Sequence, residues 1–403
     1  MKHYFLGLAA NYTRRERLRH TFAVGRKRDC DELQWFLAQK YNGDAVLCKN
    51  GRSALALALK ACFEPGDMIL VNGFTCYAVH EAIKAAKLVP VYVDISKDTL
   101  NFDIDTLARS MESADSRLAR SGPSLRAELR SNRSSLVADG LEPADTHASK
   151  LCGIIIQNTL GNPVDIVAIE KFAKKHGLKI IEDLAHCAGV KYPDGREAGT
   201  VGAATALSFG KDKSIDTISG GAVVFRDKAS LNTLPHRSPR PSDHLRARFY
   251  PLFGAICRGL SYVRLGGVFM RLLVKIHWVE KSADNKLDLT RKISKFEAKF
   301  ALCQLKKLKK SGEKPIREFY LVRDREEVLK KLKQAGYYFE GFWYEKPVSP
   351  KRYYKKVHFP EAACPNAVYV AEHIVNLPNY YSKRDLEPAR KIIKEYLIEE
   401  ERE

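Results

Sequence analysis

Residues 153–183, GIIIQNTLGNPVDIVAIEKFAKKHGLKIIED, contain a short apolar run, a helical pattern and a second short apolar run. The two runs, 153–158 and 178–183, are largely continuous rather than alternating, as expected for strands that are covered on both faces. Apolar residues at helical spacing lie between them, and Gly177 follows at a position typical of a helix C-terminus. The stretch therefore predicts a strand–helix–strand unit with parallel strands.

The same alternation extends over residues 45–226. Five further runs of strand length are 45–50, 68–73, 89–95, 204–210 and 221–226. Helical patterns such as SALALALKACF (53–63) and AVHEAIKAAK (78–87) fit between several of them. Seven strands with interposed helices predict an α/β fold, with a three-layer α/β/α arrangement around a mainly parallel seven-stranded sheet.

The rest of the chain suggests three parts. Residues 1–230 are expected to form a large domain, in which the polar stretch 110–150 is a surface insertion. Residues 231–288 are expected to form a basic amphipathic helical insertion. The helical pattern FEAKFALCQLKKLKK then opens a smaller α+β C-terminal domain, residues 289–403.

Composition limits the class of protein. The 403 residues are 45% hydrophobic and 29% charged, which excludes a disordered or collagen-like chain. The net charge of +20 favours anionic partners, such as phosphorylated small molecules, nucleic acid or an acidic membrane surface. Nine cysteines without a C-x-x-C pair predict neither a metal site nor a disulfide framework, and a cytoplasmic location is expected.

Residues 249–278 are apolar but interrupted by charge. Arg258, Arg264, Arg271 and Lys275 lie roughly on one helical side, which argues against a membrane-spanning helix and predicts a basic amphipathic surface. Two interpretations remain open. The segment either touches membranes peripherally, or packs as a helical flap on this chain or a partner subunit.

Polar side chains follow the apolar runs at the strand ends, where open parallel sheets bind ligands. They are Asn50, Gly51, Arg52 and Ser53; Gly73, Phe74, Thr75, Cys76 and Tyr77; Gln157, Asn158 and Thr159; Asp183 with His186; and Ser208 with Lys213. Together they offer a phosphate cradle, a carboxylate, a hydroxyl and an amine. This set of groups indicates pyridoxal 5'-phosphate (PLP).

Each group has a physical role in that interpretation. The Lys213 amine would form an imine with the cofactor aldehyde and later move a proton as a base. Asp183 would keep the pyridine nitrogen protonated through a charge-assisted hydrogen bond. Gly51 allows close backbone approach at a helix start, where N–H groups face the phosphate, and Ser208 adds a hydroxyl. The alternatives are a surface role for Lys213 and a helix-capping role for Asp183.

Residues 180–225, IIEDLAHCAGVKYPDGREAGTVGAATALSFGKDKSIDTISGGAVVF, resemble the DegT/DnrJ/StrS-type sugar aminotransferases, which are PLP enzymes of fold type I. Glu182, Asp183 and His186 match the run E-D-A-A-Q/H of that family. Ser208-Phe209 and the lysine five positions after the serine match its S-F-x-x-x-K motif. Further segments, from NGRSALALAL to FEAKFALCQLKKL, match in order.

The resemblance implies site residues, with some departures. Lys213 is the Schiff-base lysine, and Lys211 is a neighbour that faces solvent. His186 either contacts the O3′ side of the cofactor or is a satisfied core histidine, and Asn158 or Thr159 lies near the phenolic oxygen. Cys76 replaces the usual ring-stacking aromatic, for which Tyr77 or Phe74 could substitute. The full predicted cofactor set is Gly51, Arg52, Ser53, Cys76, Tyr77, Asn158, Asp183, His186, Ser208 and Lys213.

The resemblance also implies a function. It predicts a homodimeric PLP-dependent aminotransferase that moves an amino group from L-glutamate to a nucleotide-linked keto sugar in amino-sugar, polysaccharide or cell-envelope biosynthesis. One alternative is a PLP-dependent sugar dehydratase or lyase, although such relatives tend to replace the lysine. Another is a non-catalytic regulatory or nucleic-acid-binding homologue, for which the sequence shows no helix-turn-helix, zinc or RNP-like signature. No nucleic-acid partner is expected.

Overall fold

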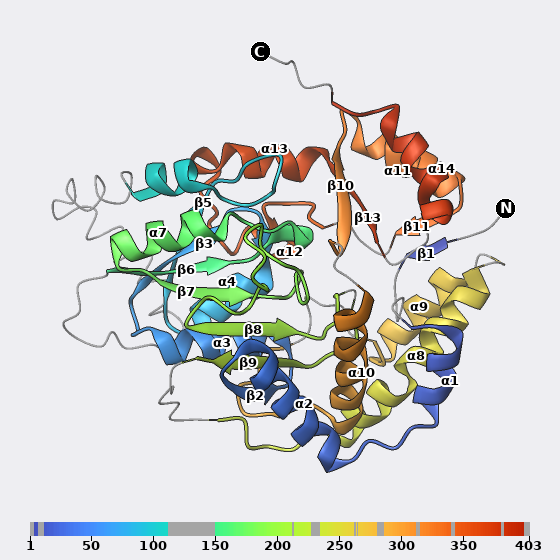
Figure 1. Cartoon of the computed structure of the whole chain (residues 1–403). Coiled ribbons are helices and arrows are strands. Elements are labelled where there is room, and N and C mark those ends of the chain that lie inside the picture. Colours follow the sequence, from blue (N-terminus) through green and yellow to red (C-terminus); the bar gives the residue numbers. More distant parts are fainter. Residues whose placement is uncertain are drawn as a thin grey trace.

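A computed structural model describes most of the chain (Figure 1). The described residues are 4–6, 12–111, 150–211, 213–226, 234–261, 263, 265–279, 286–311, 315–339, 343–379 and 383–398. Most of the predicted polar insertion, residues 112–149, lies outside them.

A seven-stranded sheet lies at the centre of the molecule (Figure 1). Its strands are β2 (Asp44–Cys48), β3 (Met68–Asn72), β5 (Val89–Val93), β6 (Leu151–Ile156), β7 (Lys179–Asp183), β8 (Ala204–Ser208) and β9 (Gly221–Phe225). The order across the sheet is β2-β9-β8-β7-β6-β3-β5. Strand β9 is antiparallel to both neighbours and the other pairs are parallel. The predicted mainly parallel seven-stranded sheet is confirmed.

Helices cover both faces of this sheet. One core cluster contains residues of α2 (Lys27–Tyr41), α7 (Ile166–His176) and α10 (Lys295–Ser311), and a second contains residues of α3 (Gly51–Cys62), α4 (Tyr77–Ala85) and α13 (Pro365–His373). Successive residues of β6 point into different clusters, because Ile154 and Ile156 belong to the first and Ile155 to the second. The three-layer arrangement is therefore present.

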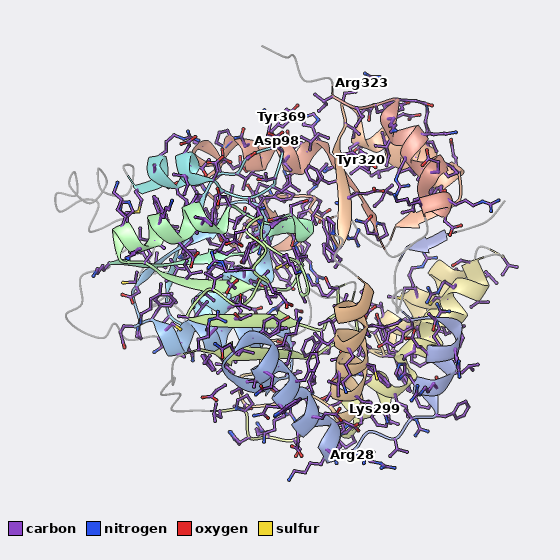
Figure 2. The ribbon with its side chains drawn as sticks, viewed as in Figure 1. Arg28, Asp98, Lys299, Tyr320, Arg323 and Tyr369 are labelled. Carbon is purple, nitrogen blue, oxygen red and sulfur yellow. The ribbon has the colours of Figure 1, made fainter. Side chains whose placement is uncertain are left out.

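The C-terminal part mixes strands and helices (Figure 1). Some of its residues form a separate small core, whereas α13 packs in the second cluster of the large sheet. Its elements are β10 (Arg317–Leu321), α11 (Arg325–Gln334), β11 (Tyr337–Phe339), β12 (Val348–Ser349), α12 (Lys351–Tyr354), η3 (Glu361–Ala363), α13, β13 (Ile374–Pro378) and α14 (Lys383–Lys394). Strands β10 and β13 are antiparallel, and Tyr320 of β10 packs against this core (Figure 2). The two short strands β1 (Tyr4–Leu6) and β4 (Thr75–Cys76) pair with β11 and β12. The exact domain boundaries stay a prediction.

Three further helices form a layer beside α10 (Figure 1). They are α1 (Arg14–Thr21), α8 (Pro241–Ser261) and α9 (Gly266–Lys275). Tyr250, Cys257, Met270 and Leu273 form the small core between α8 and α9. No helix in the described ranges is long and apolar enough to cross a membrane.

Glu297 gives α10 an unusual start. The Ser294 N–H group donates to the Glu297 carboxylate at 2.9 Å, and the Glu297 N–H group donates to the Ser294 hydroxyl at 3.2 Å. Burial raises the pKa of Glu297 from 4.5 to about 8. Between pH 4.5 and about pH 8, Glu297 holds a proton in the folded protein that it releases in the unfolded chain. The free energy of unfolding should therefore fall by up to about 1.4 kcal/mol per pH unit as the pH rises from 4.5 to 8.

We expect Glu297→Gln to remove this part of the pH dependence, because glutamine keeps an acceptor for Ser294 and does not titrate. Urea unfolding of wild type and variant at intervals between pH 5 and pH 9 measures the difference. Glu327→Gln is the matched control, since Glu327 follows the capping residue Asp324 by the same three positions but is partly exposed. Parallel pH profiles for wild type and Glu297→Gln would contradict the expectation.

Candidate active site

A cavity lies at the carboxyl ends of the central strands, as the polar strand ends predict. Gln157 follows β6, Asp183 ends β7 and Ser208 ends β8. The described residues that line the cavity are Asn50, Gly51, Arg52, Leu55, Cys76, Ala78, Val79, Gln157, Asp183, Ala185, His186, Ser208, Gly210, Lys211, Lys213, Ile218 and Tyr344. Seven of the ten predicted cofactor-binding residues are among them.

Asp183 and Lys213 lie on the same cavity, although 30 residues separate them in the sequence. Parallel pairing of β7 with β8 places Asp183 opposite Ala206, and the turn after β8 returns Lys213 to the end of β7. The Ala185 N–H group donates to the Asp183 carboxylate at 2.9 Å. Burial raises the pKa of Asp183, while this hydrogen bond and the charge of Lys213 act in the opposite direction. The site thus holds a desolvated carboxylate near an amine.

The start of α3 forms another wall of the cavity. Asn50 caps the helix by accepting from the Ser53 N–H group at 2.9 Å. A Cβ atom on Gly51 would lie 2.4 Å from the Ser208 Cβ atom, so glycine is required for this close approach between α3 and β8. Arg52, only 8% exposed, forms an ion pair with Glu81 of α4. A helix start, a guanidinium and a hydroxyl together form a place for an anion.

His186 is held as a neutral imidazole. The Leu160 N–H group donates to its Nδ1 atom at 3.2 Å, so the proton is on Nε2, which lies 3.2 Å from the Tyr344 hydroxyl. Burial, and then the charges of Lys213 and Arg317, lower the pKa of His186 well below 6.5. The ring both lines the cavity and has its hydrogen bonds satisfied, so neither of the two sequence interpretations is excluded.

Three residues from the C-terminal part of the chain complete the site, and the strand-end pattern did not reveal them. Tyr344 lines the cavity. The Trp343 ring stacks on His186, with centroids 4.8 Å apart, and lies 4.3 Å from the Lys213 Nζ atom. The Arg317 guanidinium lies 4.3 Å from the same ring. No local signal in the sequence marks the return of this part of the chain to the sheet.

Arg317 is a buried cation. It is 4% exposed, and its Nη1 atom donates to the Asn376 side chain at 2.9 Å. Within the described residues, its Nε atom has no hydrogen-bond partner and no carboxylate forms an ion pair with it. A buried charge in this state favours binding an anionic group.

The structure does not bring Asn158 to the cavity. Its backbone has a left-handed conformation, with φ of 49°, and its side-chain oxygen accepts from the Val164 N–H group at 3.0 Å. Thr159 starts the short helix η1 (Thr159–Gly161), is buried and accepts from Gln157 at 2.9 Å. Gln157, the residue before both, lines the cavity instead.

Ser53, Tyr77 and Phe74 also lie off the cavity lining. The Ser53 hydroxyl accepts from the Asp288 N–H group at 3.0 Å, which ties the start of α3 to the segment before α10. The Tyr77 ring stacks on Tyr353 with centroids 4.4 Å apart, and Phe74 is fully buried. Among residues 73–77, Cys76 is therefore the one that lines the cavity.

Lys211 corrects one expectation. It is 7% exposed and lines the cavity, so the prediction that it faces solvent is wrong. The turn at Gly210 folds both lysines back toward the strand ends. Among the described lining residues, three cations, Arg52, Lys211 and Lys213, accompany one carboxylate, Asp183. This balance favours anionic ligands.

Comparisons with known proteins show a family for this chain. Residues 31–117 and 134–235 match the model of the DegT/DnrJ/EryC1/StrS aminotransferase family. A pleiotropic regulatory protein of Geobacillus stearothermophilus is 30% identical over 185 residues, which are 46% of this chain and 40% of that protein. The UDP-2-acetamido-2-deoxy-3-oxo-D-glucuronate aminotransferase of Pseudomonas aeruginosa is 28% identical over 222 residues, 54% of this chain and 51% of that enzyme. The chain thus aligns with about half or less of these relatives.

The fold has close counterparts among solved structures. The Escherichia coli GDP-4-keto-6-deoxy-D-mannose-3-dehydratase with bound hydrated PLP superposes with a TM-score of 0.60, covering 98% of this chain and 100% of that chain at 16% sequence identity. The similarity confirms the predicted fold type I architecture.

Proposed function

Because the chain belongs to the DegT/DnrJ/EryC1/StrS aminotransferase family, we propose that it is a PLP-dependent aminotransferase. The single observation that supports this most strongly is the meeting of Lys213 and Asp183 on one cavity, opposite the start of α3. Each side chain alone has an ordinary structural explanation, but their combination at the strand ends does not.

The cavity residues fit PLP at three points. When bound, PLP supplies an aldehyde and an electron-withdrawing ring. Lys213 would provide the amine for the aldehyde, and Asp183 would keep the ring nitrogen protonated through a charge-assisted hydrogen bond. The N–H groups at the start of α3, with Ser208 and Arg52, would hold the phosphate, and the close approach at Gly51 supports this assignment.

Lys213 and Asp183 have separate roles in the proposed reaction. The Lys213 side chain lines the cavity, where its amine would act as the base that takes a proton from the α carbon of the amino donor. Asp183 would keep its charge when it is paired with a protonated ring nitrogen, and this pairing would offset the cost of its burial. Tyr344 lines the cavity and the Trp343 ring lies 4.3 Å from the Lys213 Nζ atom, where the two rings would limit the access of water to the amine.

The charges around the cavity support a choice of substrates. L-Glutamate is the proposed donor, because the buried Arg317 guanidinium can donate hydrogen bonds to a carboxylate of the donor. Arg317 and Lys213 both lie against the Trp343 ring, so this carboxylate would bind near the Lys213 amine. A nucleotide-linked keto sugar is the proposed acceptor, since its diphosphate suits the three cations of the lining. We place the reaction in amino-sugar, polysaccharide or cell-envelope biosynthesis.

The proposed assembly follows from the resemblance, and the expected location follows from the cysteine content. We propose a homodimer with its active sites at the subunit interface, and the cytoplasmic location stays a prediction. All nine cysteines are described and free of disulfides.

Adding L-glutamate to the PLP-loaded protein tests the proposal. The visible absorption band of the bound cofactor should fall on addition of glutamate, and it should return on addition of a nucleotide-linked keto sugar. In Arg317→Gln, we expect the KM for glutamate to rise by about 30-fold or more while the band is retained, because a buried charge pair is lost. No change of the band with any amino acid would contradict the aminotransferase assignment.

Mass spectrometry of the sugar product distinguishes an aminotransferase from a sugar dehydratase, which is the main alternative. An aminotransferase adds nitrogen to the sugar, whereas a dehydratase on the same fold removes a hydroxyl without adding nitrogen. The presence of Lys213 favours transfer, since this lysine is needed as the returning base. It also speaks, together with Asp183, against a non-catalytic regulatory homologue.

A further inference from the structure

Helix α9 exposes a continuous apolar side. Leu265, Val268, Leu272 and Ile276 follow one another at intervals of three or four positions and are 51%, 50%, 50% and 49% exposed. We call these four residues the α9 stripe. The other side of the helix is buried, with Met270 and Leu273 in the core against α8. The helix is thus amphipathic, but its second apolar side has no cover from the described part of the chain.

Further exposed apolar residues lie in the same segment of the sequence. Leu245, Ile256 and Val263, from α8 and the turn after it, are 49%, 36% and 63% exposed. The molecule has thirteen exposed large hydrophobic residues among those described, and seven of them fall between positions 245 and 276. Such clustering differs from single scattered apolar residues and marks an interaction surface.

The charge of this segment has one sign. Residues 244–279 contain six lysine or arginine residues and no aspartate or glutamate. Arg271 and Lys275 are exposed on α9, on the side adjacent to the stripe. Because the apolar and basic residues lie on the same exposed sector of one helix, a partner must offer both apolar and anionic groups.

A second copy of the same surface does not meet this requirement. In a two-fold symmetric contact, each side presents the same patch to the other. The exposed Arg271 and Lys275 of one subunit would then face those of its partner, and α9 has no acidic residue to offset them. The charge therefore disfavours self-association through the stripe.

An anionic bilayer surface meets both requirements. An amphipathic helix can lie in the interface with its apolar side among the acyl chains, while arginine and lysine side chains extend toward lipid phosphates. Apolar insertion and attraction to anionic lipids each contribute only a modest free energy of membrane binding, but the two contributions add together. Helix α9 is also too short and too charged to cross the bilayer.

We propose that the α8–α9 surface, centred on the α9 stripe, docks the protein peripherally on membranes that contain anionic phospholipids. This inference rests on the exposed residues of α8 and α9 and does not depend on the proposed reaction.

Flotation of the full-length, PLP-loaded protein with lipid vesicles tests it. We expect binding to vesicles of phosphatidylcholine mixed with phosphatidylglycerol, little binding to phosphatidylcholine alone, and weaker binding at high salt. Leu272→Glu should lower the vesicle partition coefficient by about tenfold or more, because it places a charge in the stripe. The double variant Arg271→Gln, Lys275→Gln should lower it about 20-fold.

Matched controls come from α7, which lies on the opposite side of the view in Figure 1. Val167→Glu replaces an apolar residue that is 39% exposed, and Lys174→Gln with Lys175→Gln removes two exposed charges. These variants should bind vesicles as wild type does. The visible band of bound PLP reports correct folding of every variant.

Two results would overturn the proposal. One is equal binding of wild type and stripe variants to the mixed vesicles, or no binding by any of them. The other is a Leu272→Glu protein that changes only its oligomeric state in size-exclusion chromatography, which would make the patch a protein interface. Loss of aminotransferase activity in the absence of membranes would concern the proposed function and not this surface.

Discussion

Lys213→Ala is expected to eliminate covalent attachment of PLP and to lower kcat by on the order of 10⁴- to 10⁶-fold, as loss of a nucleophile that also acts as base does in other enzymes. The physical reason is the position of the amine. It lies on the cavity that contains Asp183, and its charge affects the pKa of both Asp183 and His186. Alanine leaves no amine at this point and no base for the α carbon of the donor.

Lys211→Ala is the control, because Lys211 is a second lysine on the same cavity and is itself buried. Borohydride reduction of the PLP-loaded protein, followed by peptide mass spectrometry, identifies the modified lysine. We expect the cofactor mass on Lys213 in the wild type and in Lys211→Ala, and on neither lysine in Lys213→Ala. Labelling of Lys211 in the wild type would show that the sequence motif points to the wrong lysine.

The fold could be predicted because its strands are buried on both faces. In β3 and β9 every residue is buried, so the sequence has apolar runs with sharp ends. Asp183 and Ser208 are the last residues of their strands, and Gly51 begins a helix. For residues of this kind, knowing the strand ends is enough to place them on one edge of the sheet.

Other parts of the site depend on the exact residue at which a strand ends and on the path of the turn that follows it. Because successive side chains point in different directions, an error of one residue exchanges Gln157, which lines the cavity, for Asn158, which does not. The left-handed backbone at Asn158 adds to this change of direction. The burial of Lys211 likewise depends on the path of the turn after β8, which no periodic pattern describes.

The contribution of the C-terminal part lies beyond local reasoning. Arg317, Trp343 and Tyr344 reach the site from more than 100 positions after Lys213, through packing between separate parts of the chain. A sequence shows that such residues exist, but their approach to the sheet depends on tertiary contacts. The amphipathic character of α8 and α9 was predictable from spacing, whereas the exposure of the α9 stripe required the structure.

Asp183→Asn is expected to lower the rate of the glutamate half-reaction by on the order of 10²- to 10³-fold while PLP still binds. The carboxylate is needed to hold a proton on the ring nitrogen, and a neutral amide does not stabilise that charge. Rapid-mixing measurement of the visible band after addition of glutamate gives the rate. The amplitude of the band before mixing gives the amount of bound cofactor.

This substitution also separates the two interpretations of Asp183. If the side chain only accepts the hydrogen bond from the Ala185 N–H group, at 2.9 Å, asparagine replaces it with little loss, because both residues cap turns and helices about equally well. A capping role thus predicts an unchanged rate and an unchanged unfolding midpoint. A role on the ring nitrogen predicts an unchanged or higher midpoint with a much lower rate, since burial of the charged group, which raises the pKa of Asp183, is no longer required. A rate in Asp183→Asn within a few-fold of wild type would therefore contradict the electrostatic role on which the proposed function depends.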